Sequence, residues 1–289
     1  MAERPPPPAL STAPLTPGLY VVATPIGNLR DITLRALDVL AAADLILAED
    51  TRVSARLLGA YGLKGRLERY DEHAAERARP KALQALAEGA RVALVSDAGT
   101  PLISDPGYRL VREAVEQGFA VFPIPGPSSV LAALSVAGLP TDRFLFAGFP
   151  PPKAAARRAF LAELAPVRAS LVFFEGGSRL AASLADMAEV LGPRRAMVGR
   201  ELTKLYETCL RGPLDQLAAD PAVQTPKGEM VVIVEPGAEV AATPEDADAA
   251  LAEALTRMGP AEAAAQVAQA LGLSRRDLYR RALDLKGAR

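Results

Sequence analysis

Short apolar segments alternate with amphipathic segments along the first half of this 289-residue chain. The apolar segments predict strands at 18–23, 44–49, 66–71, 91–96 and 119–124. The segments with helical spacing of apolar residues predict helices at 33–43, 51–59, 74–88, 107–117 and 127–137. Strands that alternate with helices at this spacing form βαβ units, so we predict an α/β domain with a mainly parallel sheet.

Loops rich in glycine and proline follow three of these predicted strands. Their sequences are TPIGN at 24–28, SDAGTPLISDPG at 96–107 and PGPSS at 125–129. Ligands of open α/β sheets bind beyond the carboxyl ends of the strands, and glycine lets the backbone approach a ligand closely. We therefore predict a small-molecule site in the first half of the chain. The absence of a G-x-G-x-x-G motif argues against a dinucleotide.

The second half of the chain has a different pattern, and a proline run at 150–152 marks the change. The predicted strands there are 170–174, 195–200, 205–211 and 229–234, with helices at 154–164 and 178–191. No helix separates 195–200 from 205–211, which predicts antiparallel pairing and an α+β domain.

We expect four regions along the chain. They are a disordered proline-rich tail at 1–17, an α/β domain with the ligand loops at 18–143, an α+β domain that closes the cleft at 144–236, and a small basic helical domain at 244–289. Breaks at Gly259-Pro260 and at Gly272 divide the last region into two or three helices.

Composition excludes several classes of protein. The single cysteine, Cys209, rules out an intramolecular disulfide or a C-x-x-C motif, and the single histidine, His73, rules out a histidine-rich metal site. We predict no bound metal. The N-terminal tail lacks the apolar region of a secretory signal, and no segment has the uninterrupted apolar length of a membrane span, so we predict a cytoplasmic protein.

The net charge of −1 conceals a basic C-terminal segment. Residues 271–289 contain six Arg or Lys against two Asp. Such a segment suits RNA contact because phosphate neutralisation drives nucleic-acid binding. Charge alone favours a solvated helix face, whereas a helical appendage on an enzyme favours RNA.

The motifs of the chain, taken together and in order, resemble a known family. LYVVATPIGNL at 19–29, AEDTR at 48–52, the 95–107 block, GLP at 138–140, RELTK at 200–204 and KGEMV at 227–231 are similar to the ribosomal RNA small-subunit methyltransferase I group of the tetrapyrrole methylase family. The resemblance runs from about 18 to 235, with a weaker similarity at 274–285. Two departures are Gly176-Gly177, where the family often has a polar residue after Glu175, and the proline-rich tail.

The resemblance implies two α/β domains with S-adenosylmethionine in the cleft between them, a homodimer, and methylation of a cytidine ribose 2′-hydroxyl in the small-subunit decoding centre. The cofactor positions that it implies are Pro25, Gly27, Asp97, Ala98, Gly99, Thr100, Pro101, Ser104, Asp105, Gly107, Gly126, Ser128, Ser129, Phe173, Phe174, Gly228 and Glu229. Simpler interpretations remain open: Asp97 as an Asx-turn residue, the serines as helix caps and the phenylalanines as core.

Candidate residues for chemistry and substrate binding follow the predicted strands at 44–49 and 195–200, or lie in a loop and in the basic C-terminal helices. Asp50, Glu201 and His73 are the candidate catalytic residues, with none singled out as general base. The candidate substrate-binding residues are Arg52, Arg56, Arg200, Lys204, Arg275, Arg276 and Arg280. The first two arginines share a helix face that suits phosphates. The alternative for all of these residues is ordinary surface charge.

Two other functions remain alternatives at this point. One is methylation of a small tetrapyrrole on the same fold, because a fold does not fix a substrate. The other is a non-catalytic RNA-binding assembly factor.

Overall fold

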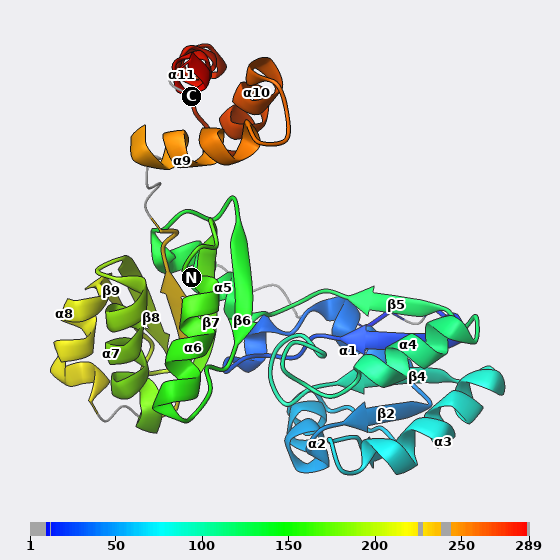
Figure 1. The fold of residues 1–289 in the computed structure, drawn as a ribbon. Helices are drawn as coiled ribbons and strands as arrows, with labels where there is room; N and C mark the ends of the chain where they lie inside the picture. Colours follow the sequence, from blue (N-terminus) through cyan, green and yellow to red (C-terminus); the bar gives the residue numbers. More distant parts are fainter. Residues whose placement is uncertain (1–9, 12, 225–227, 238–243, 288–289) are drawn as a thin grey trace, which may run out of the picture. The chain divides into compact units, whose positions relative to one another are not determined.

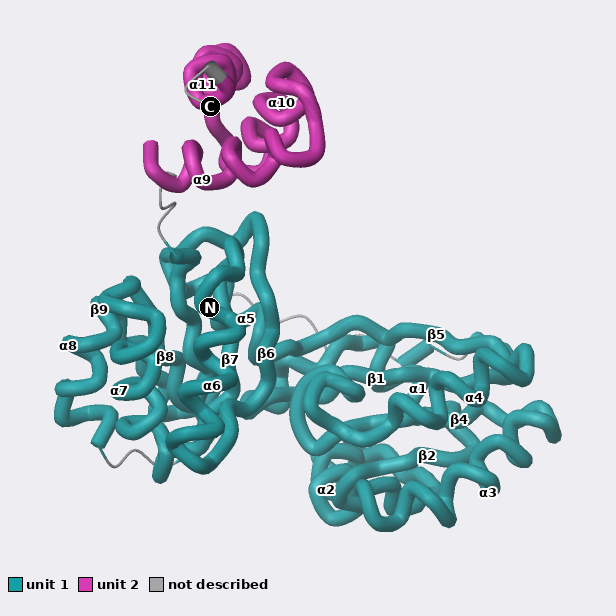
Figure 2. The backbone as a smooth tube through the Cα atoms, viewed as in Figure 1, with its two compact units in different colours: residues 1–237 teal, residues 238–289 magenta. Residues whose placement is uncertain are grey.

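The computed structural model describes residues 10–11, 13–224, 228–237 and 244–287. The chain divides into two compact units, Met1–Gly237 and Ala238–Arg289 (Figure 2). Some of the predicted features lie outside the described residues: residues 1–9 and 12 of the predicted tail, Lys227 of the KGEMV motif, and residues 288–289 of the predicted helical domain.

The first sheet of unit 1 is five-stranded and parallel, with the order β3-β2-β4-β1-β5 (Figure 1). Its strands are β1 (Gly18–Val22), β2 (Leu45–Ala48), β3 (Leu67–Arg69), β4 (Arg91–Val95) and β5 (Val121–Ile124). The accompanying helices are η1 (Leu29–Asp31), α1 (Leu34–Ala42), α2 (Thr51–Ala60), α3 (Ala75–Ala87) and α4 (Tyr108–Glu116). The predicted parallel α/β sheet is confirmed.

Both faces of this sheet are buried, which explains the nearly continuous apolar runs of its strands. Successive residues of a strand point to opposite faces. Tyr20 and Ala93 accordingly pack with α1 and α2, whereas Leu19 and Val92 pack with α3 and α4. All the carboxyl ends of these strands meet at one edge, so the loops that follow them gather there.

The second sheet is mixed, with the order β6-β7-β10-β8-β9. Its strands are β6 (Phe144–Gly148), β7 (Ser170–Gly176), β8 (Arg195–Arg200), β9 (Thr208–Pro213) and β10 (Glu229–Val234). The helices are α5 (Ser129–Ala137), α6 (Ala154–Leu164), η2 (Gly177–Arg179), α7 (Leu180–Leu191), α8 (Leu214–Ala219) and η3 (Pro221–Val223). Only β6 and β7 pair in parallel, and the predicted antiparallel pairing of β8 with β9 is confirmed.

Helix α5 connects the two sheets. It follows β5 of the first sheet, yet its Val130 and Leu134 pack against Met197 and Ile233 of the second sheet. The other face of the second sheet is covered by α6, α7 and α8. The loop before α5 therefore crosses from one sheet to the other.

Three details differ from the sequence expectation. β6 lies at 144–148, where only a boundary was predicted, and the short helix α8 was not predicted. The strand expected at 205–211 begins only at Thr208, so the prediction was wrong for 205–207. Leu205 and Tyr206 are apolar but exposed, and their pattern was mistaken for the start of a strand.

Unit 2 contains α9 (Pro244–Ala254), α10 (Pro260–Leu271) and α11 (Arg275–Gly287). Gly259 and Gly272 flank α10, as predicted, and Gly272 adopts the left-handed conformation with φ 65°. Arg281 of α11 makes two hydrogen bonds of 2.7 and 2.6 Å to the Asp248 carboxylate of α9, which fixes these helices together. Among the described residues of either unit, no helix is long and apolar enough to cross a membrane.

A buried ion pair holds the segment that leads from β6 into α6. The Arg157 guanidinium donates to Asp186 of α7 at 2.6 Å and to the carbonyl of Pro152 at 3.2 Å. Both charged side chains are less than a tenth exposed. Loss of one partner leaves an uncompensated buried charge.

We predict that Arg157→Ala lowers the free energy of unfolding by about 3–5 kcal/mol, because Asp186 then remains buried with less compensation. Urea denaturation followed by circular dichroism measures the change. Arg158→Ala is the matched control: Arg158 contacts the same Asp186 at 3.1 Å but is 44% exposed, so its loss should cost less than about 1 kcal/mol. Equal losses for the two variants would contradict the assignment.

Candidate active site

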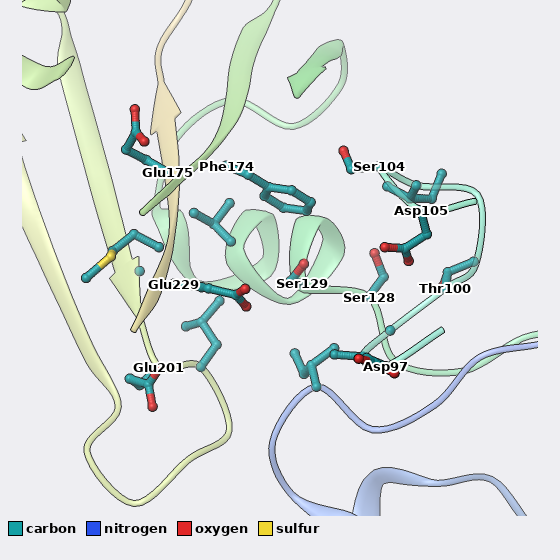
Figure 3. A pocket seen from close by; sticks show the side chains of 18 of the residues that line it. Asp97, Thr100, Ser104, Asp105, Ser128, Ser129, Phe174, Glu175, Glu201 and Glu229 are labelled. Atoms are coloured by element: carbon teal, nitrogen blue, oxygen red, sulfur yellow. The ribbon is translucent and has the colours of Figure 1, made fainter. Parts of the chain in front are cut away.

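A cavity of about 310 Å³ lies within unit 1, between loops at the carboxyl edge of the first sheet and strands of the second sheet (Figure 3). The first sheet contributes the loops after β1, β2 and β4, and the start of α5 adds Ser128 and Ser129. The second sheet contributes residues of β7, β8 and β10 and the loop after β8. In Figure 3, Asp97, Thr100 and Asp105 lie on one side, and Glu201 and Glu229 lie across the cavity from them.

Backbone hydrogen bonds connect the loops of the first sheet to one another. Thr24 and Gly99 exchange two N–H···O bonds of 2.8 and 3.0 Å, which join the loop after β1 to the loop after β4. The Thr100 hydroxyl donates to the Pro127 carbonyl at 3.1 Å, which adds the loop after β5. Gly99 has φ +85°, a conformation that favours glycine. The three predicted loops therefore form one connected wall.

Among the described residues, six carboxylates line this cavity: Glu49, Asp97, Asp105, Glu175, Glu201 and Glu229. Burial is the main cause that raises the pKa of the Glu49 and Asp97 carboxyls. Burial, followed by the negative charge of Glu49, raises the pKa of Asp105 to about 6. A partly buried group of like charges favours cationic groups and hydrogen-bond donors in a ligand.

The wall from the second sheet combines aromatic and charged side chains. The ring of Phe174 makes edge contacts with Phe146 and Phe149, at centroid distances of 4.8 and 5.5 Å. Next to Phe174, the buried Glu175 accepts hydrogen bonds from the Ser183 hydroxyl and pairs with Arg179 at 2.6 Å. This wall therefore presents the apolar ring of Phe174 beside the Glu175 carboxylate, which its hydrogen bond and ion pair hold in place.

The structure brings many of the predicted site residues together. The ones that line the cavity are Asp97, Ala98, Gly99, Thr100, Ser104, Asp105, Ser128, Ser129, Phe174, Glu201, Lys204 and Glu229. Their binding role stays a prediction with which these positions agree.

Other predicted cofactor residues surround the cavity without lining it. They are Pro25, Gly27, Pro101, Gly107, Gly126, Phe173 and Gly228. Phe173 is fully buried in the core of the second sheet, which is the simpler interpretation given above. Three glycines permit close packing: an added Cβ would lie 2.4 Å from Lys204 Cγ at Gly27, 2.7 Å from Leu94 Cδ2 at Gly107 and 2.2 Å from Glu201 Oε1 at Gly228.

The three candidate catalytic residues occupy different environments. Glu201 lines the cavity and pairs with Lys204 at 3.0 Å. Asp50 caps α2, and hydrogen bonds from the Arg52 side chain hold the pKa of its carboxyl well below its usual range. His73 lies exposed in the turn before α3. Neither Asp50 nor His73 lines the cavity, so a catalytic role for either stays a prediction.

The candidate substrate residues are also dispersed. Arg52 is 87% exposed and pairs with Asp50, and Arg56 is exposed on the same helix. Arg200 ends β8 next to Glu201, and Lys204 reaches the cavity. Arg275, Arg276 and Arg280 lie in α11 of the other compact unit.

Sequence reasoning missed several residues that line the cavity. They are Ile26, Glu49, Ile103, Phe149, Glu175, Gly199, Leu202, Met230 and Val231. Glu49 had a usable signal, since it stands at the end of β2 just before Asp50. Phe149 had none, because its place depends on β6 pairing with β7, and that strand was not predicted.

Comparison with known proteins gives two family matches. Residues 18–218 match the model of the Tetrapyrrole (Corrin/Porphyrin) Methylases, and residues 241–286 match the model described as the RsmI C-terminal HTH domain.

Several curated relatives are similar over nearly the whole chain. A protein of Mesorhizobium japonicum named Ribosomal RNA small subunit methyltransferase I is 54% identical over 94% of each chain. Proteins with the same name from Erythrobacter litoralis and Escherichia coli O157:H7 are 54% and 46% identical, and cover 96% and 93% of this chain and 98% and 96% of their own.

Solved structures share the fold. The uroporphyrin-III-C-methyltransferase of Thermus thermophilus superposes with a TM-score of 0.54 at 22% identity, over 74% of this chain and 93% of its own. The methyltransferase CobJ gives a TM-score of 0.56 at 22% identity, over 76% and 95% of the two chains. At this identity the likeness confirms the predicted two-domain fold and nothing finer.

We predict that Asp105→Asn stabilises the protein at pH 8 by about 1 kcal/mol, with allowance for solvent screening of a half-exposed group. The pKa of the Asp105 carboxyl is higher in the folded protein than in the unfolded chain, so its ionisation destabilises the folded state. The destabilisation begins above the unfolded-state pKa near 4 and is complete above the folded-state pKa near 6. The gain should therefore stay nearly constant well above pH 6 and shrink as the pH falls from about 6 towards 4. Urea denaturation over this range measures it, with the exposed Asp142→Asn as control. A gain that is independent of pH would contradict the electrostatic cause.

Proposed function

The chain belongs to the family of tetrapyrrole (corrin/porphyrin) methylases, and from this premise we propose that it methylates the RNA of the small ribosomal subunit. The observation that carries the proposal is the 54% identity, over 94% of both chains, to a protein named Ribosomal RNA small subunit methyltransferase I. The match of residues 241–286 to the C-terminal domain model of the same group supports it. We further propose that the acceptor is the ribose 2′-hydroxyl of a cytidine.

The cavity residues fit S-adenosylmethionine as the methyl donor. A volume of about 310 Å³ is at the lower end of the range for small-molecule sites. The donor carries a sulfonium and an ammonium group, and the carboxylates Asp97, Asp105 and Glu229 complement such cations. The ring of Phe174 offers an apolar face for adenine, and the N-terminus of α5 at Ser128 and Ser129 suits a carboxylate.

When bound, the donor supplies an electrophilic methyl group on a positively charged sulfur. The role of the protein is mainly to hold the acceptor hydroxyl in line with it, and positioning of this kind contributes roughly 7–11 kcal/mol in favourable cases. The hydroxyl also loses a proton. Of the three candidate residues, Glu201 is the one whose place in the cavity supports a role as acceptor of that proton.

Unit 2 provides a surface suited to RNA. Helices α10 and α11 are joined by a short turn that contains the left-handed Gly272, which is typical of a helix-turn-helix. Arg275, Arg276 and Arg280 are exposed on α11. Arg280 makes a long, exposed ion pair with Asp277 at 3.4 Å, and Arg281 pairs more closely with Asp248 at 2.6 Å. Side chains do not read the deep major groove of A-form RNA, so we propose that these three arginines contact phosphates.

Methylation of a tetrapyrrole is the second candidate function. It is favoured by the name of the matching family model and by the titles of structural neighbours, and neither fixes the substrate of this chain. We retain two expectations as proposals, a homodimer and a cytoplasmic location, because both fit an enzyme that acts on ribosomal RNA.

A transfer assay with radiolabelled S-adenosylmethionine tests the function. The protein is incubated separately with small ribosomal subunits, naked small-subunit RNA and a porphyrinogen mixture. We expect label in RNA, within a dinucleotide that resists alkali, because a 2′-O-methyl group removes the nucleophile of alkaline cleavage. Asp97→Ala should bind the donor more weakly in calorimetric titration and transfer less label. Label in the porphyrinogens would favour the second candidate, and label in an alkali-labile nucleotide would refute the ribose as acceptor.

A separate prediction concerns the exposed arginines of α11 in unit 2. The triple variant Arg275→Ala, Arg276→Ala and Arg280→Ala should weaken binding to small-subunit RNA and reduce the dependence of affinity on salt, because fewer counterions are released. Affinity for S-adenosylmethionine should not change.

The matched control is Arg112→Ala with Arg109→Ala and Arg77→Ala, which removes the same charge from the first-sheet helices α3 and α4. Filter binding over a series of salt concentrations measures both variants. Equal salt slopes for the two would show that only net charge matters and that α11 is an ordinary solvated helix.

A further inference from the structure

The loop between β8 and β9 presents two apolar side chains to solvent. Leu205 is 88% exposed and Tyr206 is 71% exposed, and they are the two most exposed large apolar side chains among the described residues. Isolated exposed apolar residues need no explanation, but two adjacent ones that directly follow a cavity-lining residue in the sequence do. The same loop carries Glu201, Leu202 and Lys204, which line the cavity.

This loop is held in a fixed conformation. The Thr203 N–H donates to the Glu207 carboxylate at 2.6 Å, and the Lys204 N–H donates to the Glu201 carbonyl at 3.0 Å. Leu202 is buried in the core beneath α5. The exposure of Leu205 and Tyr206 is therefore a built feature of an ordered loop.

The loop conformation also carries strain. Glu201 and Thr203 have φ of 50° and 67°, a region that non-glycine residues rarely adopt. Such strain persists only where the surroundings impose it, and it gathers at functional sites. Here the stem of Lys204 packs on the backbone of Gly27 in the loop after β1. Lys204 is thereby directed to the cavity, and the next two residues are exposed to solvent.

We propose that Leu205 and Tyr206 form a platform on which a nucleobase beside the target nucleotide stacks. The inference rests on the proposed RNA substrate and assigns positioning residues to it. Consecutive Cα atoms are 3.8 Å apart, so Tyr206 lies within about 8 Å of Lys204 along the backbone. A single-stranded RNA with one nucleotide at the cavity brings its neighbour to this loop. Proteins recognise unpaired bases of RNA by stacking them on aromatic side chains.

The size of the patch favours a nucleobase over a second copy of the chain. An aromatic side chain contributes about 150–250 Å² of surface, so the pair offers a few hundred Å² at most. Stable protein interfaces bury about 1,200–2,000 Å². One base needs only one ring face, which the Tyr206 ring supplies.

The test compares Tyr206→Ala, Tyr206→Phe and the control Tyr108→Ala. Tyr108 is 65% exposed and begins α4, and it does not line the cavity. Base stacking is worth about 1–3 kcal/mol, so Tyr206→Ala should raise the Kd for a single-stranded RNA fragment that the wild-type protein methylates by roughly 5- to 150-fold. Tyr206→Phe keeps the ring and should bind nearly as tightly as wild type. Tyr108→Ala should have no effect.

Two further measurements make the outcomes distinct. Calorimetric titration should show unchanged affinity for S-adenosylmethionine in every variant, and sedimentation should show unchanged mass. Wild-type RNA affinity in Tyr206→Ala would overturn the platform and leave the proposed function intact. A loss of mass in Tyr206→Ala would identify a second copy as the occupant instead. If the wild-type protein neither binds nor methylates RNA, the proposed function fails, and the platform fails with it.

Discussion

The packing of α5 on the second sheet is the constraint on which the site depends. The chain leaves β5 of the first sheet, turns through 125–128 and buries Val130 and Leu134 against the second sheet. One covalent connection therefore places the ligand loops of the first sheet opposite β7, β8 and β10. Interiors are close-packed, so a buried helix fixes its position far better than a flexible linker does. The cavity forms because α5 follows a strand of the first sheet in the sequence but packs against the second sheet.

Much of the architecture was accessible from the sequence, and the reasons for the exceptions are physical. The first sheet is buried on both faces, so its strands have continuous apolar runs that are easy to recognise. β6 was missed because Phe144 to Gly148 lies beside a proline run and at an edge, where pairing with β7 decides the structure. Leu205 and Tyr206 were misassigned because sequence does not reveal that an apolar pair stays exposed. The loop residues of the site were predicted individually, but their hydrogen-bonded connection through Thr24 and Gly99 was not.

The acidic and basic side chains of the protein suit two different ligands, the methyl donor and RNA. The cavity gathers carboxylates, which suit a cationic methyl donor and repel the phosphates of RNA. The α11 arginines that we propose to contact phosphates are not among the residues that line the cavity. Some basic residues are already occupied, since Arg52 pairs with Asp50 and Arg281 pairs with Asp248. An ion pair with a neighbour neutralises a charge that would otherwise attract phosphate, so residues such as Arg276 on α11 are better suited to RNA than Arg52 is. Lys204, by contrast, lines the cavity and shares its charge with Glu201.

Strained backbone conformations occur in loops of both sheets that line the cavity. In the part of the chain that the structure describes, the non-glycine residues with positive φ are Leu102, Ser104, Glu201 and Thr203. Two follow β4 of the first sheet and two follow β8 of the second, and both loops line the cavity. Each such conformation costs of the order of 1–3 kcal/mol and survives only when the surrounding packing imposes it. Strain on both facing loops is hard to explain by stability alone, because a glycine at these positions would relieve it. The conformations are better explained by what they direct: Asp105 into the cavity from one side, and Lys204 into it from the other.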